Sequence, residues 1–138
     1  MKGVQKSLRL PEETLKEIEE LSAETGRDFS TITKDLLTEA IKMRRCPGII
    51  VGEGVSGRRA EVAGTGIEVW EIIAAYKSVG KDLKRLKKVY HWLSQEQVKA
   101  ALSYYSAYPE EIDRLIDRNE RWTKKKIQER HPFMGPRS

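Results

Sequence analysis

The sequence is poor in the residues that build disulfides, metal sites and catalytic centres. Its 138 residues include one cysteine and two histidines. One cysteine excludes an internal disulfide, and the three residues together are too few for a typical structural zinc site. This usage of cysteine is typical of proteins in the reducing cytoplasm. We therefore predict a cytoplasmic protein that has no metal and no cofactor.

Long apolar runs are missing as well. The chain lacks a run of about 18 apolar residues, which excludes a membrane-spanning helix, and residues 1–10 lack the apolar core of a secretory signal. Apolar residues make up 38% of the chain and charged residues 34%, with a net charge of +5. The composition fits one ordinary domain or two very small ones. The positive charge is compatible with a polyanionic partner, and a solvated mixed-charge surface fits it nearly as well.

Motifs for catalysis are also absent. His91 and His131 are far apart, and Glu110 and Glu111 are neighbours that point to different sides of a helix. Residues 52–57 spell GxGxxG, which matches the dinucleotide-binding fingerprint, but the next residues alternate like a strand instead of starting a helix. We predict a glycine-rich β-hairpin here, and no catalytic residue in the chain.

Residues 4–45 are predicted to form a strand followed by two helices. Pro11 stops the strand and opens the first helix, Gly26 ends that helix, and Asp28 caps the second. Such a short chain with one unpaired strand cannot bury its apolar faces alone. We therefore predict a homodimer, with a tetramer left open. Its predicted core residues are Leu8, Leu10, Ile32 and Leu36.

Residues 1–46 resemble the ribbon-helix-helix family, the fold of the Arc and MetJ repressors. The resemblance rests on residues 7–13, 26–30 and 36–40. It implies that two chains pair their strands into a ribbon that enters the major groove of double-stranded operator DNA. The implied base contacts are Gln5, Ser7 and Arg9, and the implied phosphate contacts are Arg27, Phe29 and Ser30. The alternative is a ribbon that only dimerises the protein.

Residues 47–121 are predicted to form the hairpin and four helices. Thr65 and Glu68 match a capping box that opens a helix closed by Gly80, and a short helix follows over residues 82–90. Ser94 and Gln97 match a second capping box, and a last helix starts at Pro109. Residues 122–138 are predicted to be a basic tail that is loose after Lys126.

This second region resembles the family known as domain of unknown function 433. The matching residues include 48–49, 58–60, 64–70, 93–98, 100–105 and 108–112. The resemblance implies a helix-turn-helix-like antitoxin that pairs with a toxin of PIN-like ribonuclease fold. The expected recognition helix, residues 95–107, has only one basic residue and one acidic residue, which gives it little attraction for DNA. We therefore favour a protein-contact or dimerising role for this region. The basic residues between 81 and 88 can contact phosphates or form a solvated face.

The basic tail is the predicted toxin-binding segment. By the same resemblance, PIN-type nuclease sites are rich in carboxylates, with which a basic tail can pair. An apolar anchor would add to the interface. The predicted residues are Trp122, Lys124, Lys125, Lys126 and Ile127. A frayed basic helix end is the alternative.

Taken together, the sequence predicts a mainly α protein that is the antitoxin of a type II toxin–antitoxin pair and represses its own operon. Two alternatives remain open. One is a dimeric transcriptional regulator without a toxin partner. The other is a protein-interaction module whose ribbon only dimerises it.

Overall fold

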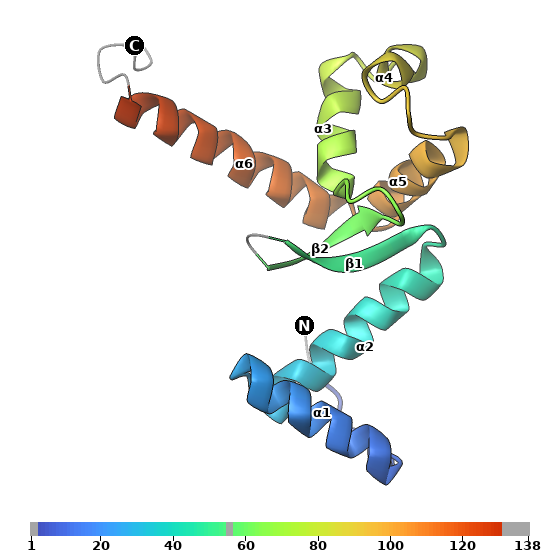
Figure 1. The fold of residues 1–138 in the computed structure, drawn as a ribbon, viewed down its shortest axis with the longest axis vertical. Helices are drawn as coiled ribbons and strands as arrows, with labels where there is room; N and C mark the ends of the chain where they lie inside the picture. Colours follow the sequence, from blue (N-terminus) through green and yellow to red (C-terminus); the bar gives the residue numbers. More distant parts are fainter. Residues whose placement is uncertain (1–2, 55–56, 131–138) are drawn as a thin grey trace. The chain divides into compact units, whose positions relative to one another are not determined.

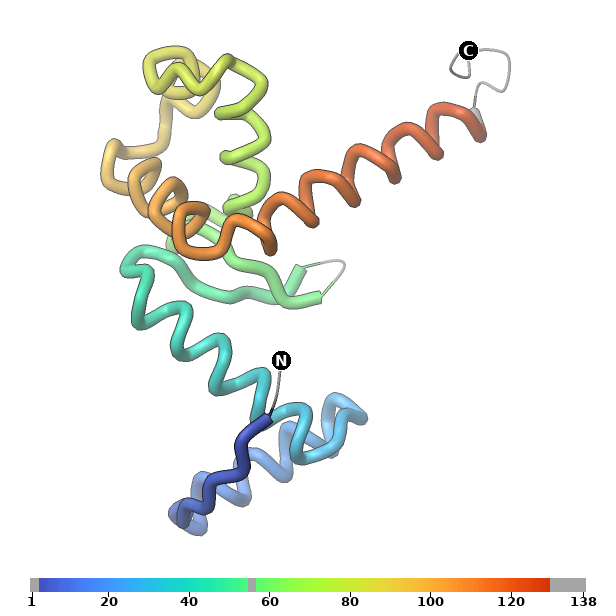
Figure 2. The backbone as a smooth tube through the Cα atoms, turned by 180° about the vertical axis from the view of Figure 1, so that it is seen from behind, coloured from blue at the N-terminus to red at the C-terminus, as the bar shows by residue number. Residues whose placement is uncertain are grey.

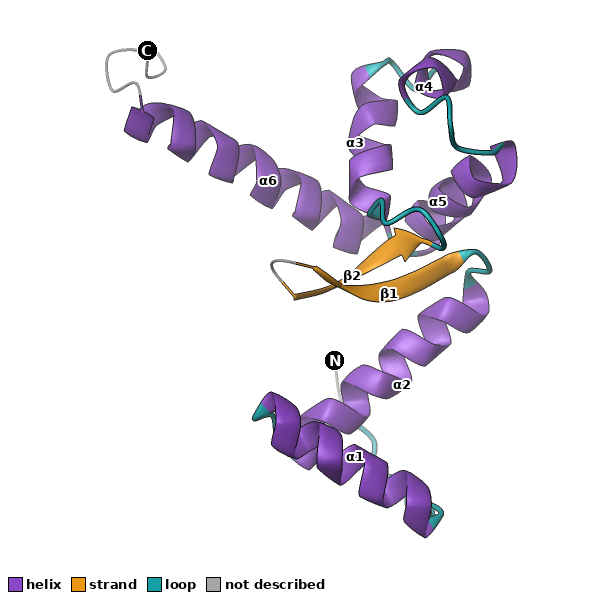
Figure 3. Ribbon diagram, viewed as in Figure 1, coloured by secondary structure: helices purple, strands orange, loops and turns teal. Residues whose placement is uncertain are grey.

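The computed structural model describes residues 3–54 and 57–130 of the chain. Within these ranges the fold is mainly helical, with six helices and a two-stranded antiparallel sheet (Figures 1 and 3). The mainly α class predicted from the sequence is confirmed. The chain divides into two compact units, Met1–Lys42 and Met43–Ser138. None of the helices in the described ranges is long and apolar enough to cross a membrane.

The N-terminal unit contains two helices joined by a tight turn. α1 runs over Glu12–Thr25, and α2 runs over Phe29–Arg45 and ends in the second unit. Gly26 ends α1 in the left-handed conformation, with φ of 71°, where a residue without a Cβ is favoured. The Asp28 carboxylate accepts a 2.7 Å hydrogen bond from the Thr31 N–H. Both predicted helix boundaries are confirmed.

The segment before α1 is an extended arm and not a strand. Residues 3–11 have no regular secondary structure (Figure 2), so the strand predicted over residues 4–10 is not formed in the single chain. Strand backbone groups must bond to a neighbouring strand, and the described part of one chain supplies none to this arm. Every residue from 3 to 10 is exposed.

The C-terminal unit starts with the predicted hairpin. β1 (Ile49–Gly54) pairs antiparallel with β2 (Gly57–Val62), which places Gly52 opposite Arg59. A Cβ on Gly52 would lie 2.9 Å from a carboxylate oxygen of Glu61 on the other strand, so a larger residue would displace that side chain. The GxGxxG glycines therefore serve a hairpin, as predicted. Its turn residues 55–56 lie outside the described ranges.

Four helices follow the hairpin, in the predicted order. They are α3 (Val69–Ser78), α4 (Leu83–Val89), α5 (Gln95–Ala107) and α6 (Pro109–Arg130). The capping box at the start of α5 is confirmed: the Ser94 hydroxyl accepts from the Gln97 N–H at 3.1 Å, and the Gln97 side chain accepts from the Ser94 N–H at 2.8 Å.

The capping box predicted for α3 is wrong. The N-cap is Glu68, whose partner in the box is Glu71. The Thr65 hydroxyl instead donates to the Val62 carbonyl at 2.8 Å and accepts from the Ile67 N–H, and so closes a turn. A β-bridge between Glu61 and Glu68 keeps the chain extended up to Glu68, which delays the helix by one turn.

The core of the C-terminal unit surrounds α3, which lies against α4, α5, α6 and β2. Its most deeply buried side chains include Ile72, Ile73 and Tyr104. The Tyr104 hydroxyl donates a 2.6 Å hydrogen bond to the Glu111 carboxylate, so this buried polar group has a partner. The buried members are Cys46, Ile49, Ala60, Val62, Val69, Ile72, Ile73, Leu86, Leu93, Val98, Ala101, Tyr104 and Ile112.

α6 is longer than predicted. It continues to Arg130, so residues 122–130 are helical and the prediction of a loose chain from residue 127 is wrong. The segment 120–130 consists largely of good helix formers and has no proline or glycine. The second half of α6 extends away from α3 and α5 (Figures 1 and 2). Residues 131–138 of the predicted tail lie outside the described ranges.

Candidate nucleic-acid and protein interfaces

The three predicted base-contacting residues all lie on the extended arm. Gln5, Ser7 and Arg9 are exposed and separated by one residue each. In a strand, such spacing places side chains on the same face. Arginine pairs with guanine and glutamine with adenine in the major groove. The arm therefore carries suitable side chains for base recognition, although one chain alone does not order it as a strand.

The N-terminal unit leaves most of its apolar side chains in water. Among the predicted dimer-core residues Ile32 is buried, at 8% exposure, but Leu8 is 74% exposed, Leu10 36% and Leu36 37%. The structure therefore does not bring these four together in one chain. Large exposed apolar side chains of the described part of this unit are Val4, Leu8, Leu10, Leu15, Leu21, Phe29, Leu36, Leu37 and Ile41. This uncovered apolar surface is therefore a candidate interaction surface.

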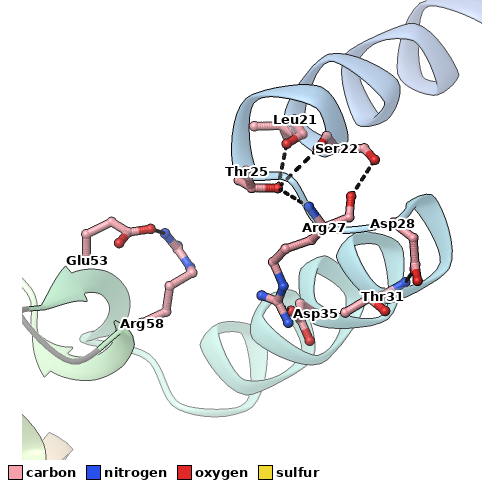
Figure 4. Close-up of polar contacts among 9 residues, drawn as sticks. All are labelled: Leu21, Ser22, Thr25, Arg27, Asp28, Thr31, Asp35, Glu53 and Arg58. Carbon is pink, nitrogen blue, oxygen red and sulfur yellow. Dashed lines mark hydrogen bonds and ion pairs between the residues drawn. The ribbon is translucent and has the colours of Figure 1, made fainter.

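The predicted phosphate contacts lie where α1 ends and α2 begins: Arg27 is in the turn, which Figure 4 shows, and Phe29 and Ser30 are the first residues of α2. Asp28 uses its carboxylate and its carbonyl to accept from the amides of Thr31 and Ile32. Within the described residues, the amides of Phe29 and Ser30 have no such partner, which leaves two donors at the positive end of α2.

Charges next to this turn are mixed. Arg27 forms an ion pair with Asp35 and is still 47% exposed. The hydrogen bond from Thr31 lowers the pKa of Asp28, so that carboxylate is charged at neutral pH. A phosphate bound at Phe29 and Ser30 would accept hydrogen bonds from two backbone amides. The negative charge of Asp28 would repel it and so weaken this binding.

The predicted toxin-binding residues lie on α6 and not on a tail. Trp122 is 59% exposed and Ile127 49% exposed. The Lys126 ammonium lies 5.1 Å from the Trp122 ring centroid, as expected for residues four apart on a helix. Lys125, three residues after Trp122, shares this face, whereas Lys124 and Ile127 turn away from it, so the five residues do not form one face.

The structure has a groove between α4 and α5 that was not predicted from the sequence. It has a volume of about 440 Å³ and is lined by Leu83, Lys84 and Lys87 of α4 and by Val98, Lys99 and Leu102 of α5. The spacing of the α5 residues is that of one helix face. That pattern is visible in the sequence, but nothing in it shows that α4 supplies the opposite wall.

Within the described ranges, no three His, Cys, Asp or Glu side chains lie close enough together to hold a metal ion.

Comparison with known proteins gives a family match within the C-terminal unit. Residues 49–105 match the sequence profile described as "Protein of unknown function (DUF433)". The chain is also similar to the crystal structure of a DUF433 member protein from Anabaena variabilis ATCC 29413. The two are 30% identical over 78% of this chain and 99% of that chain, with a TM-score of 0.44. The similarity to the DUF433 family thus covers residues 49–105, in the C-terminal unit. A search of curated proteins gives no significant match.

Proposed function

We propose that this chain is a homodimeric, sequence-specific DNA-binding protein that represses its own operon as the antitoxin of a type II toxin–antitoxin pair. The observation that carries the proposal is the N-terminal unit, in which an exposed arm with base-reading side chains is joined to an uncovered apolar surface. A cytoplasmic location is part of the same proposal.

The apolar surface supports dimerisation. Fully burying a leucine side chain contributes about 1.5–3 kcal/mol. Leu8, Leu10 and Leu36 keep between 36% and 74% of their surface exposed. A second chain whose arm pairs with this one would cover these side chains and satisfy the backbone groups of residues 4–10 at the same time. A dimer therefore meets both needs of the unit.

DNA recognition follows from the same pairing. When Leu8 and Leu10 face the helices, Gln5, Ser7 and Arg9 face away from them. A two-stranded ribbon fits the major groove. The amides of Phe29 and Ser30, which have no other bond in the described residues, would hold a backbone phosphate and set the position of the ribbon on the duplex.

The toxin partner is proposed to bind the end of α6. Trp122 is exposed and makes a cation–π contact with Lys126, and tryptophan is one of the residue types enriched at the energetic centres of interfaces. A PIN-like toxin, which the DUF433 resemblance implies, would offer carboxylates to the lysines of this segment.

A measurement of DNA binding tests the proposed recognition of operator DNA. We would measure fluorescence anisotropy of the full chain on the DNA upstream of its own gene and on a scrambled duplex, over a series of salt concentrations. We expect a preference for the upstream DNA and a steep salt dependence. Arg9→Ala should reduce the preference by about tenfold or more, while the dimer stays intact. Arg121→Ala, an equal loss of charge on α6, is the control.

If Arg9→Ala binds its site as tightly and as selectively as the parent, the ribbon does not read DNA. Equal, weak binding of both duplexes by the parent would leave a protein whose arm only dimerises it.

Dimerisation has its own test in Leu8→Ala. Leu8 is 74% exposed in the single chain, and truncation at such a position changes stability by at most about 0.5 kcal/mol in a monomer. In a paired ribbon Leu8 is a core residue, so we expect the dimer dissociation constant to rise about tenfold or more. Sedimentation equilibrium measures it, with Val89→Ala, 48% exposed on α4, as the control. Equal dissociation constants for Leu8→Ala and the parent contradict the paired arm.

The antitoxin role is tested with the protein encoded next to this one. A chain that ends at Arg121 should lose binding to that partner while it keeps its preference for the upstream DNA. Unchanged partner binding by this shortened chain removes α6 from the toxin contact. If the intact chain does not bind that partner, the protein is a regulator without a toxin.

A further inference from the structure

The groove between α4 and α5 exists because the two helices do not pack on each other. Both lie against α3, but their backbones, which are described over their whole length, do not come within contact distance. The space between them has a volume of about 440 Å³. The short segment from Tyr90 to Ser94 joins the two walls.

The lining of this groove has an apolar part, called the floor here, and a charged part, called the rim. Leu83, Val98 and Leu102 form an apolar floor, and Leu83 is 50% exposed although it is a large apolar side chain. The floor extends the unit's core outward, because Val98 is itself a core member at 4% exposure. The groove thus offers an apolar surface next to the packed core.

The rim is positive. Lys84, Lys87 and Lys99 line it, and no carboxylate does. In the described part of the chain none of these three ammonium groups has an ion-pair partner. The acids nearest in sequence are Asp82, which accepts from the backbone amide of Lys84 at 2.9 Å as the cap of α4, and Glu96, which is three residues before Lys99 and does not line the groove. The groove thus pairs an apolar floor with three available cations.

We propose that this groove binds an acidic amphipathic helix of a partner protein. The apolar stripe of such a helix would cover Leu83 and Leu102, and its flanking Asp and Glu side chains would pair with Lys84, Lys87 and Lys99. This is recognition of a helix in a groove, with the charges on the rim setting specificity and association rate. The inference goes beyond DNA binding, because the groove lies wholly in Met43–Ser138.

Duplex DNA is the competing occupant, and the floor argues against it. Phosphates would match the lysines of the rim, but they would leave Leu83 and Leu102 without an apolar partner. An acidic amphipathic helix matches both the floor and the rim. The partner is therefore a protein segment in which acidic side chains flank apolar ones at a spacing of three and four residues.

The test uses a synthetic, fluorescein-labelled helical peptide with leucine at every third and fourth position and glutamate between. Anisotropy with the full chain should show saturable binding that weakens as salt increases. Leu83→Ser, and separately the double variant Lys84→Gln with Lys87→Gln, should each weaken it about tenfold. The matched control is Lys16→Gln with Lys34→Gln, two exposed lysines of the N-terminal unit, which removes the same charge. A peptide with alanine in place of leucine should bind much less.

Three results would overturn the proposal. One is the absence of saturable binding by the parent chain. Another is equal weakening by the groove pair and the control pair, which would mean attraction by net charge alone. The third is a groove variant that weakens binding to a labelled duplex but not to the peptide, which would make this a DNA-contacting surface. All variants change exposed side chains, and their melting temperatures check that the fold is kept.

Discussion

Ile72 and Ile73 in the C-terminal unit are fully shielded from water, whereas Ile18 and Ile32, the buried residues of the described N-terminal unit, keep 7% and 8% of their surface exposed. The contrast extends to the surface. Leu36, on the same helix as Ile32, is 37% exposed. One unit completes its core within a single chain. The other has apolar residues in suitable positions and lacks the surface that would cover them.

Size and topology explain this difference. The C-terminal unit has a hairpin and four helices, and α3 is surrounded by neighbours on several sides. The N-terminal unit has two helices and an unpaired arm, and domains of about 40 residues seldom bury enough surface alone. The same amphipathic helix pattern therefore gives a core in one unit and a candidate interface in the other.

The largest expected effect comes from truncating each core. Ile72→Ala should lower the free energy of unfolding of the C-terminal unit by about 2–5 kcal/mol, because its surroundings cannot collapse fully into the cavity. Ile18→Ala should destabilise the N-terminal unit, with a midpoint that depends on protein concentration if a second chain completes that core. Urea unfolding measures both.

The probes separate the units. Tryptophan occurs at positions 70, 92 and 122, so fluorescence reports on the C-terminal unit, while far-ultraviolet circular dichroism reports on all helices. We expect the fluorescence midpoint to be independent of concentration. If both substitutions shift both signals equally, the units unfold as one body and the comparison fails.

An intermediate effect is expected at Tyr104. Its side chain is 1% exposed, and Tyr104→Phe leaves Glu111 without the 2.6 Å hydrogen bond, which costs about 1–3 kcal/mol. Burial raises the pKa of Tyr104 above its ordinary value. The unfolded chain therefore loses the proton first as pH rises above about 10, and stability falls with pH there.

Tyr104→Phe should flatten this alkaline loss in the fluorescence transition. All five tyrosines lie after residue 70, so the substitution should leave the N-terminal transition unchanged. Burial also raises the pKa of Tyr90, and part of the alkaline loss should therefore persist in the variant. An unchanged slope above pH of about 10 would mean that Tyr104 is accessible to solvent.

Local signals in the sequence predicted the fold well, and signals that depend on distant residues did not. Gly26, Asp28 and the Ser94–Gln97 box act within one turn of backbone, and all are found where predicted. Thr65 and Glu68 matched the same box, but the bridge from Glu61 to Glu68 competes with it. The groove could not be predicted, because its walls come from two helices that meet only through α3.

The candidate DNA site shows the same limit. The spacing of Gln5, Ser7 and Arg9 and the position of the α2 N-terminus are local properties that the sequence contains. Whether the arm forms a strand does not depend on the local sequence alone, because its backbone groups need a second strand that the described chain does not supply. The arm is thus the element for which sequence and single-chain structure differ most.

The smallest expected effect compares the caps of α2 and α5, one in each unit. Ser94→Ala should lower the stability of the C-terminal unit by about 1 kcal/mol at any pH, because a hydroxyl cap does not titrate. The cap of α2 is the Asp28 carboxylate, whose pKa is lowered by the hydrogen bond from Thr31. A depressed native pKa means that its contribution is present above the unfolded pKa and is lost as pH falls through the native value.

Acidification below pH of about 4 should therefore weaken the N-terminal transition through Asp28. Asp28→Asn keeps an equally good cap without the titration, so the acid-dependent difference between parent and variant isolates this group. Circular dichroism in urea at about pH 6 and pH 3 measures it. Equal acid losses in the parent and in Asp28→Asn would show that the cap of α2 carries no pH dependence.

Removing the Asp28 charge should also strengthen phosphate binding at Phe29 and Ser30, because the remaining donors are backbone amides, and this links the cap directly to the proposed DNA contact.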